Sequence, residues 1–284
     1  MEYHVPSVAL AAQALKLLSR DKYKASTLKS IADKLGASPT TCLRVLRTLE
    51  QEEFIHCDGE TKRYSLGPYL VPLGNRAAEL NDTVARASRE IKRIAAVTGL
   101  TTAVIQRWDD RPVFIATAQP AEDDGRLTRL SITIGQPTPL TSGAHGRCFL
   151  AYDHDEAEWR RHAAAGLRPL TANTITDPEQ FVETLREVRR NGYAISHGEF
   201  YAGTSAVDVP IFEAGGRVAL VISCMYVTSQ MDDGRLAEVV EVLREAARKL
   251  SQWNGYTAHA GEGFWPVDGA RAAPTPTPRP ASRD

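Results

Sequence analysis

The chain has 284 residues, of which 43% are apolar and 24% are charged, and its net charge is −1. This composition provides enough apolar residues for the cores of two globular domains, and it excludes a fully disordered chain. No apolar run approaches the roughly 18 residues of a membrane span, and the N-terminal segment lacks the features of a secretory leader. We therefore expect a cytoplasmic protein that has no contact with a membrane.

The N-terminal segment predicts three helices followed by a hairpin. Helical periodicity and end signals place the helices at residues 5–20, 26–35 and 38–53. An Asp-Gly turn between two short strands predicts the hairpin, at residues 54–57 and 62–66. Ser26 and Ser38 are the expected N-caps, and Gly36 is the expected stop of the second helix. Pro39 suits the first helical position, where its missing N–H costs nothing.

On the first helix, one apolar stripe at helical spacing is expected to face the core: Val8, Ala11, Leu15 and Leu18. On the third helix, the expected inward residues are Cys42, Val45, Leu46 and Leu49. The opposite face of the third helix is polar, and this face is the one that bears on function.

Residues 68–98 predict connecting helices that end at Gly99, and a second domain follows. Its strands are expected at 100–108, 111–119, 127–134, 193–200, 203–211 and 217–227. Its helices are expected at 143–152, 155–165, 178–191 and 232–252. Three strands, then helices, then three strands and a last helix predict an α+β fold. Residues 254–284 end in a Pro-rich sequence, for which we expect a disordered or extended tail.

Two helices, a turn, a third helix and a hairpin follow the order of a winged helix-turn-helix, whose third helix enters the major groove of DNA. The candidate DNA-binding residues are Ser38, Thr40, Thr41, Arg44 and Arg47 on that helix, with Lys62 and Arg63 on the hairpin. Either helical arginine suits a guanine edge, and the others suit phosphates. For each residue, the alternative is an ordinary solvated face. The net charge of +2 over residues 1–75 permits DNA contact without arguing for it.

Residues 26–55 (STLKSIADKLGASPTTCLRVLRTLEQEEFI) and 63–70 (RYSLGPYL) resemble the N-terminal domain of the IclR family of bacterial transcription regulators. Arg44 stands where that family usually has an arginine. PLTSGAHGRCFLAY resembles the family's PLHxTAxGKAxLA stretch. The segment that begins GYAISHGEF and continues to VALVIS resembles its GYAxDxxExxxGxxCIAAPIxDxxGxVxAALSIS stretch. The resemblance covers residues 5–252, with the segments in the family's order.

The resemblance implies four parts: a winged helix-turn-helix over 1–67, linker helices over 68–98, a GAF-like effector-binding domain over 99–253, and the tail 254–284. It also implies a homodimer or homotetramer that binds double-stranded operator DNA under the control of a small organic effector. The apolar stripe of the linker, which needs a partner, favours an oligomer as well.

The chain departs from the family where effector contacts cluster. Thr141 replaces a histidine, Arg147 a lysine, Ala206 a cysteine and Asp208 an alanine, and the acidic position after GYA reads Ser196-His197. The effector of a known member therefore does not transfer to this chain.

The candidate effector-binding residues come from a loop and two strands. They are Ser142, Gly143, Ala144, His145, Ser196, Thr204, Ala206, Asp208 and Ser223. Alternation puts Thr204, Ala206 and Asp208 on one strand face. A buried Asp208 must meet a donor, which is His145, His197, an arginine or the ligand. An inward carboxylate favours a ligand with donors, such as an amide, hydrazide or amine. The alternative for each residue is sheet packing or a capping turn.

The sequence gives weaker support for a metal site, a cofactor site or a catalytic site than for a DNA-binding regulator. The chain has no P-loop, GxGxxG or HExxH motif, and His56-Cys57 lacks a second ligand pair, so we predict neither a metal nor an organic cofactor. The four cysteines form no C-x-x-C pair, which fits a reducing compartment. His145 and Cys148 lie three residues apart, a poor geometry for covalent catalysis, and we interpret Cys148 as a core residue. The alternative to a regulator is a hydrolase-like enzyme with an accessory winged helix that binds a protein.

Overall fold

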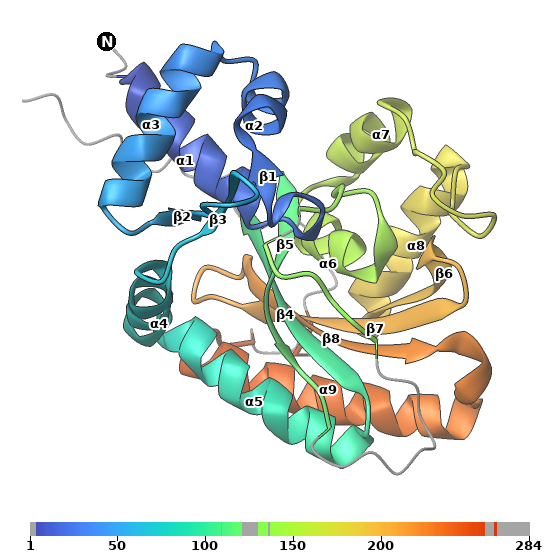
Figure 1. Ribbon diagram of the computed structural model, residues 1–284. Coiled ribbons are helices and arrows are strands. Elements are labelled where there is room, and N and C mark those ends of the chain that lie inside the picture. The colour runs from blue at the N-terminus through green and yellow to red at the C-terminus, as the bar shows by residue number, and fades with distance from the viewer. Residues whose placement is uncertain (1–3, 109, 121–129, 136, 259–263, 266–284) are drawn as a thin grey trace, which may run out of the picture. The chain divides into compact units, whose positions relative to one another are not determined.

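The computed structural model describes residues 4–108, 110–120, 130–135, 137–258 and 264–265. The chain divides into two compact units. Unit 1 comprises Met1–Ala85 with Ile132–Gln136, and unit 2 comprises Arg86–Ser131 with Pro137–Asp284. Helices and strands occur in both units, so the fold is α+β (Figure 1).

Unit 1 consists of small helices and a three-stranded antiparallel sheet. Its helices are α1 (Pro6–Leu18), η1 (Asp21–Tyr23), α2 (Leu28–Leu35), α3 (Pro39–Gln51) and α4 (Leu70–Leu80). Its strands are β1 (Ser26–Thr27), β2 (Ile55–Cys57) and β3 (Arg63–Leu66), in the order β1-β3-β2. The first three helices and the hairpin follow the predicted order, and β1 is an addition that the sequence pattern did not indicate.

The turn between α2 and α3 is built from local signals. Gly36 adopts a left-handed conformation with φ of 64° and ends α2. Ser38 is the N-cap of α3, since its hydroxyl accepts a hydrogen bond from the N–H of Thr41, and Pro39 opens the helix. These signals confirm the predicted start of α3.

The predicted N-cap of α2 is wrong. Thr27 caps α2, and its hydroxyl accepts from the N–H of Ser30 at 3.3 Å. Ser26 pairs with Tyr64 in the sheet, and its hydroxyl donates to the carbonyl of Tyr23. Residue 26 therefore belongs to a strand, because a distant segment of the chain supplies its pairing partner.

The helices of unit 1 enclose one apolar core. It contains Ala14, Leu17, Leu18, Ile31, Ala32, Cys42, Leu46, Leu49, Ile55 and Tyr64. The inward face of α3 matches the prediction, with Val45 at its partly buried edge. On α1 most of the predicted stripe faces the core. Leu18 is buried and Ala11 and Leu15 are partly buried against the core, but Val8 is 64% exposed, because the helices pack against the C-terminal half of α1.

The hairpin is held by one carboxylate and one close backbone approach. Asp58 Oδ1 accepts hydrogen bonds from the N–H of Glu60 at 3.1 Å and from the N–H and hydroxyl of Thr61 at 2.6 and 2.7 Å. After β3, Gly67 donates its N–H to the carbonyl of Phe54. A Cβ at Gly67 would lie 2.2 Å from the carbonyl oxygen of Glu53, so only glycine fits there.

Unit 2 is a five-stranded antiparallel sheet covered by helices on both faces. Its strands are β4 (Thr101–Trp108), β5 (Arg111–Ala118), β6 (Ala194–Tyr201), β7 (Thr204–Phe212) and β8 (Val218–Val227), in the order β5-β4-β8-β7-β6. Its helices are α5 (Asp82–Thr98, which begins in unit 1), α6 (Gly143–Asp153), α7 (Glu156–Ala164), α8 (Pro178–Asn191), η2 (Thr228–Gln230) and α9 (Asp233–Trp253).

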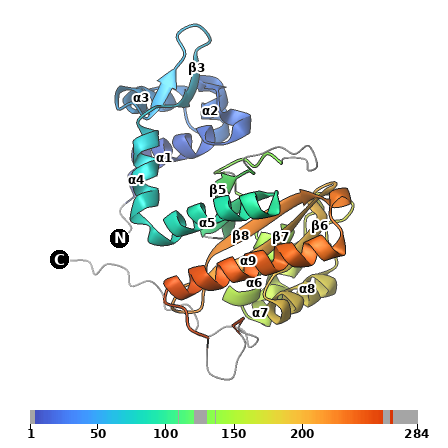
Figure 2. The ribbon, with the colours of Figure 1, turned by 90° about the horizontal axis from the view of Figure 1, so that it is seen from below.

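Helices α5 and α9 lie on one face of this sheet, and α6, α7 and α8 lie on the other (Figures 1 and 2). Alternate residues of the strands therefore face different layers. The hydroxyl of Thr102 donates to the carbonyl of Ile91 on α5, whereas Cys148 on α6 donates to the carbonyl of Asp208. The α6 side of the sheet carries the polar residues considered below.

Two predictions need correction. The strand expected at 127–134 is not present in its described part, residues 130–134. There, the N–H of Leu130 donates to the hydroxyl of Thr101 instead of joining a ladder, and residues 127–129 lie outside the described residues.

The second correction concerns the expected tail. Tyr256 and Trp265 are 7% and 5% exposed and pack against Phe212, because their rings bury apolar area on unit 2. The Pro-rich sequence at 266–284 and residues 259–263 lie outside the described residues.

Candidate functional site

The first candidate site is the exposed face of α3 and the adjoining hairpin. All seven residues that the sequence analysis selected here have exposed side chains: Ser38, Thr40, Thr41, Arg44, Arg47, Lys62 and Arg63. Their exposure follows from the periodicity of α3, which turns the apolar residues inward and leaves the polar ones in solvent.

The seven residues differ in whether their side chains already form hydrogen bonds or ion pairs within the protein. Ser38 and Thr41 bond to each other through their hydroxyls at 2.8 Å, which ties both to the cap. Arg63 donates to the carbonyl of Ala25 at 2.9 Å. Arg44 and Arg47 form no ion pair with any residue that the structure describes, so their guanidinium groups are available to a partner.

The second candidate site lies on the α6 face of the sheet in unit 2. Strand pairing places four residues in one row across the sheet. From β6 to β4 they are Ala194, Asp208, Ser223 and Ala103. The next row holds Ser196, Ala206 and Met225. Paired residues of neighbouring strands point to the same face and alternation along β7 adds Thr204, so five of the selected residues share this face.

His145 on α6 connects this face to the loop before the helix. Its Nδ1 lies 3.5 Å from Oδ2 of Asp208, and its Nε2 lies 2.9 Å from the hydroxyl of Thr138. The rings of Phe114 and Phe200 contact the imidazole edge-on, with centroids 5.4 and 6.2 Å away. The imidazole is thus fixed between two aromatic rings, and it is the protein partner of Asp208 that the sequence analysis named first.

Asp208 is fully buried, and neither of its carboxylate oxygens accepts a hydrogen bond from a residue that the structure describes. The contact with His145 is within ion-pair range but lacks hydrogen-bond geometry. His197 is exposed, so it does not serve Asp208. Buried polar atoms without partners are uncommon, and each such atom calls for a physical explanation.

The thiol of Cys148 is an inert neighbour of this carboxylate. Cys148 is fully buried, and burial, followed by the negative charge of Asp208, raises the pKa of its thiol well above the ordinary value. The thiol therefore stays protonated at neutral pH and does not act as a nucleophile. This geometry agrees with its interpretation as a core residue.

Ser142, Gly143 and Ala144 lie at the buried N-terminus of α6. Ser142 is the N-cap residue, but its side chain accepts no hydrogen bond from the helix. Gly143 has a φ of 69°, and a Cβ there would lie 3.0 Å from Cε1 of His145. Gly146 fits because a Cβ there would lie 2.0 Å from the carbonyl oxygen of Leu140. The two glycines let the loop and the imidazole fold close to the helix.

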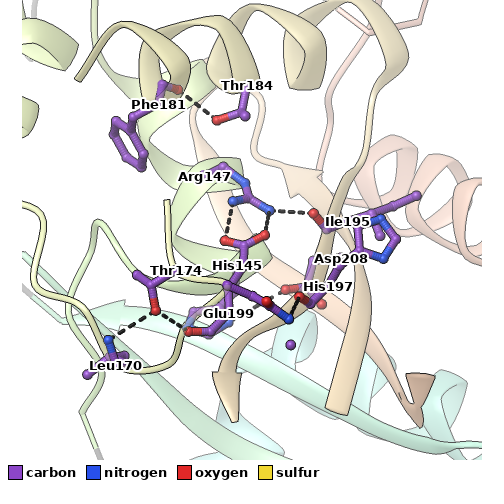
Figure 3. A network of polar contacts seen from close by, with 12 residues as sticks. His145, Arg147, Leu170, Thr174, Phe181, Thr184, Ile195, His197, Glu199 and Asp208 are labelled. Carbon is purple, nitrogen blue, oxygen red and sulfur yellow. Dashed lines mark hydrogen bonds and ion pairs between the residues drawn. The ribbon is translucent and has the colours of Figure 1, made fainter. Parts of the chain in front are cut away.

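A buried ion pair at this end of α6 was not predicted from the sequence. Arg147 and Glu199 are 3% and 7% exposed, and the guanidinium binds both carboxylate oxygens, at 2.6 and 3.0 Å (Figure 3). Arg147 also donates to the carbonyl of Ile195. The signal was present, since Arg147 replaces the lysine of the family pattern and Glu199 matches its glutamate. The partners are far apart in the chain, however, so the sequence pattern did not pair them.

Thr204 lies at the start of β7, on the same strand face as Ala206 and Asp208, where it is partly buried and pairs with Val227. Among the described residues, no three His, Cys, Asp or Glu side chains form a group that suits a metal ion. None of the helices in the described part of the chain has the length and apolar character needed to cross a membrane.

The chain is similar in sequence to a known protein family and to characterised relatives. Residues 76–252 match the family profile described as bacterial transcriptional regulator IclR C-terminal. The chain is 30% identical to the HTH-type transcriptional regulator BhcR of Paracoccus denitrificans over 236 residues, which cover 83% of each protein. It is 26% identical to the DNA-binding transcriptional repressor YiaJ of Escherichia coli over 233 residues, or 81% of each.

A solved structure is also similar to this chain. It is the crystal structure of an IclR transcriptional regulator from Alicyclobacillus acidocaldarius, which shares 52% sequence identity and a TM-score of 0.85. The match covers 89% of this chain and 100% of that one. The similarity therefore extends over both units.

Proposed function

Because the chain belongs to the IclR family of bacterial transcriptional regulators, we propose that it binds operator DNA and that a small organic effector sets its affinity. The observation that carries this proposal is the capped helix α3, whose exposed face presents two arginines that form no ion pair with a described residue, beside a hairpin that exposes Lys62 and Arg63. Its relative YiaJ is named a repressor, and we expect repression here as well.

We propose that residues 1–67 form a winged helix-turn-helix, with α3 as the recognition helix and β2–β3 as the wing. Arg44 and Arg47 lie where base edges are read, and Lys62 and Arg63 lie where backbone phosphates are met. Ser38, Thr40 and Thr41 surround the helix N-terminus, a position that attracts a phosphate. The exposure of all seven side chains supports this assignment.

We propose a homodimer or a homotetramer in which the linker, residues 68–98, makes contacts between subunits. None of the α4 side chains, all of which are described, is buried. Val71, Leu73 and Leu80 are 64%, 42% and 73% exposed, which is costly for a helix without a partner. A monomer in light scattering at micromolar concentration, with and without DNA, would contradict this assignment.

Residues 99–253 are the proposed effector domain, with a GAF-like sheet, and residues 254–284 are the tail. The proposed effector-binding residues are Ser142, Gly143, Ala144, His145, Ser196, Thr204, Ala206, Asp208 and Ser223. The burial of the polar group around Asp208 supports a small-molecule site, since such sites combine apolar walls with a few polar groups.

A protein that acts on operator DNA is expected in the cytoplasm.

A hydrolase-like enzyme is the alternative function, and one observation favours it. Thr138, His145 and Asp208 form a hydroxyl–imidazole–carboxylate series. The hydroxyl of Thr138 also donates to the carbonyl of Pro112 at 3.2 Å and is only 4% exposed, which disfavours a nucleophile. Hydrolysis of p-nitrophenyl acetate that is lost in Thr138→Val would favour the enzyme.

The decisive experiment measures DNA binding by fluorescence anisotropy. Duplexes of about 30 base pairs, three helical turns, are selected by the full chain from a random library. Specific binding must weaken steeply between about 50 and 200 mM salt, because each neutralised phosphate releases counterions. If no duplex is enriched and no binding occurs at low salt, the proposed function is wrong.

A further inference from the structure

The strongest unexplained feature of unit 2 is the carboxylate of Asp208. It is fully buried on the α6 face of the sheet, and both of its oxygens lack a hydrogen-bond donor among the described residues. An ionised carboxylate offers only acceptor sites, about four in all. The folded chain therefore holds a set of acceptors that is ready for a donor.

The neighbouring protein groups do not supply that donor. His145 approaches no closer than 3.5 Å, and its second nitrogen is engaged with Thr138. The thiol of Cys148 donates to the backbone carbonyl of Asp208 and not to its carboxylate. The nearest buried guanidinium on α6, that of Arg147, is committed to Glu199 and Ile195. These contacts fix the groups around Asp208, but none of them donates a hydrogen bond to its carboxylate.

The N-terminus of α6 offers the opposite chemistry. Its first N–H groups have no side-chain cap, and its first turn is buried and includes His145. Uncapped N–H groups at a helix start bind carbonyl or carboxylate oxygens. The site therefore places donors at one end and the acceptors of Asp208 at the other, with His145 between them.

We propose that the effector carries a hydrogen-bond donor, such as the nitrogen of a primary amide, which binds Asp208, and a carbonyl oxygen, which binds the N-terminus of α6. The assignment rests on the proposed function of unit 2 as an effector domain. It also selects against a simple carboxylic acid, because that ligand would bring a second negative charge close to Asp208. Asp208 is the specificity-determining residue, and the Phe114 and Phe200 rings favour a flat organic group beside His145.

The first test needs no ligand. Melting temperatures of the parent, Asp208→Asn and Asp208→Ala are compared. We expect both variants to melt at or above the parent temperature, because each removes a buried carboxylate whose oxygens accept no hydrogen bond from the described residues. A decrease of more than about 5 °C in both variants would show that the carboxylate is held structurally by His145, and the proposal would be wrong.

The second test compares matched ligands. Benzamide and benzoate, and propionamide and propionate, are titrated into the full chain, and binding is measured by calorimetry and by thermal shift. The amide of at least one pair should bind the parent at least about tenfold more tightly than the acid. In Asp208→Ala this preference should vanish or reverse.

A matched control is Asp153→Asn, which removes a buried carboxylate at the other end of α6, where it pairs with Arg107 at 2.9 Å. This control should keep the preference for the amide. Three results would overturn the proposal: tighter binding of the acid by the parent, no binding of either amide, or an unchanged preference in Asp208→Ala.

DNA binding is measured on the same samples by anisotropy. A parent protein that binds DNA but prefers the acid contradicts only the ligand assignment. A parent protein that binds an amide but no DNA contradicts only the proposed function.

Discussion

On α3, the polar side chains point to solvent and the helix is complete without any partner, whereas beneath α6 the polar side chains are buried and some of them lack partners. The face of α3 follows from caps and periodicity within 13 residues. The face beneath α6 needs two strands and a helix to bring Asp208, Ser223 and His145 together.

This difference determines whether a substitution at each candidate site changes the free energy of binding or the free energy of unfolding. An exposed arginine on α3 is solvated in the free protein, so we expect its removal to change DNA binding and to leave stability nearly unchanged. A buried charge beneath α6 has already lost its water, so its partners determine the stability of the fold.

The largest effect is expected for Arg147→Ala. This change leaves Glu199 buried without its bidentate partner, and breaking such a pair costs roughly 3–5 kcal/mol. The melting temperature should fall by about 10 °C, measured by calorimetry. The double variant with Met at 147 and Leu at 199 should recover most of this loss. If Arg147→Ala melts like the parent, the ion pair does not hold α6 to β6, and the contrast fails.

Arg44→Ala should reduce operator affinity by about 1–3 kcal/mol if it contacts a guanine, which is roughly 5- to 150-fold. Its melting temperature should match that of the parent. Arg47→Ala tests the second arginine, and Arg217→Ala is the matched exposed control in unit 2, where Arg217 pairs with Glu213. Anisotropy gives the affinities. Unchanged affinity in both α3 variants would remove α3 from the DNA interface.

Lys62→Ala should have a smaller and more uniform effect. If Lys62 contacts a phosphate from the proposed wing, it should contribute equally to all duplexes, and its loss should lower the slope of log affinity against log salt by about 1. Arg63→Ala is harder to interpret, because it also removes the hydrogen bond from Arg63 to the carbonyl of Ala25. A change in sequence preference with an unchanged salt slope would contradict this role for Lys62.

The smallest effect concerns the pH response of the hairpin. Hydrogen bonds from the side chain and the backbone of Thr61 lower the pKa of Asp58 below its ordinary value. Because the folded pKa is the lower one, the ionised form stabilises the hairpin above the ordinary Asp pKa of about 3.9. That contribution disappears as pH falls through the folded pKa. An NMR titration should place the midpoint of Asp58 below the ordinary value, and Thr61→Val should raise it. An unshifted midpoint would show that these bonds do not hold the loop.

Much of unit 1 could be predicted from sequence because its signals are local. Ser38 and Pro39 mark the start of α3, Gly36 marks the end of α2, and the spacing of Cys42, Leu46 and Leu49 sets the buried face. The exposed arginines follow from that face by helix geometry alone. The error at Ser26 arose where a distant strand, β3, captured the residue.

The α+β class, the order of elements and the alternation that turns Asp208 inward follow from sequence patterns alone. Which buried charges meet depends on how segments that are distant in the chain pack together. Strand order places β8 beside β7, and α6 brings Arg147 to Glu199, 52 residues away along the chain. Tertiary packing also brings Nδ1 of His145 to 3.5 Å from Oδ2 of Asp208, but the carboxylate accepts no hydrogen bond from the described residues. Local spacing fixes how a segment folds, but long-range packing chooses its partners, and the chemistry of a buried site depends on those partners.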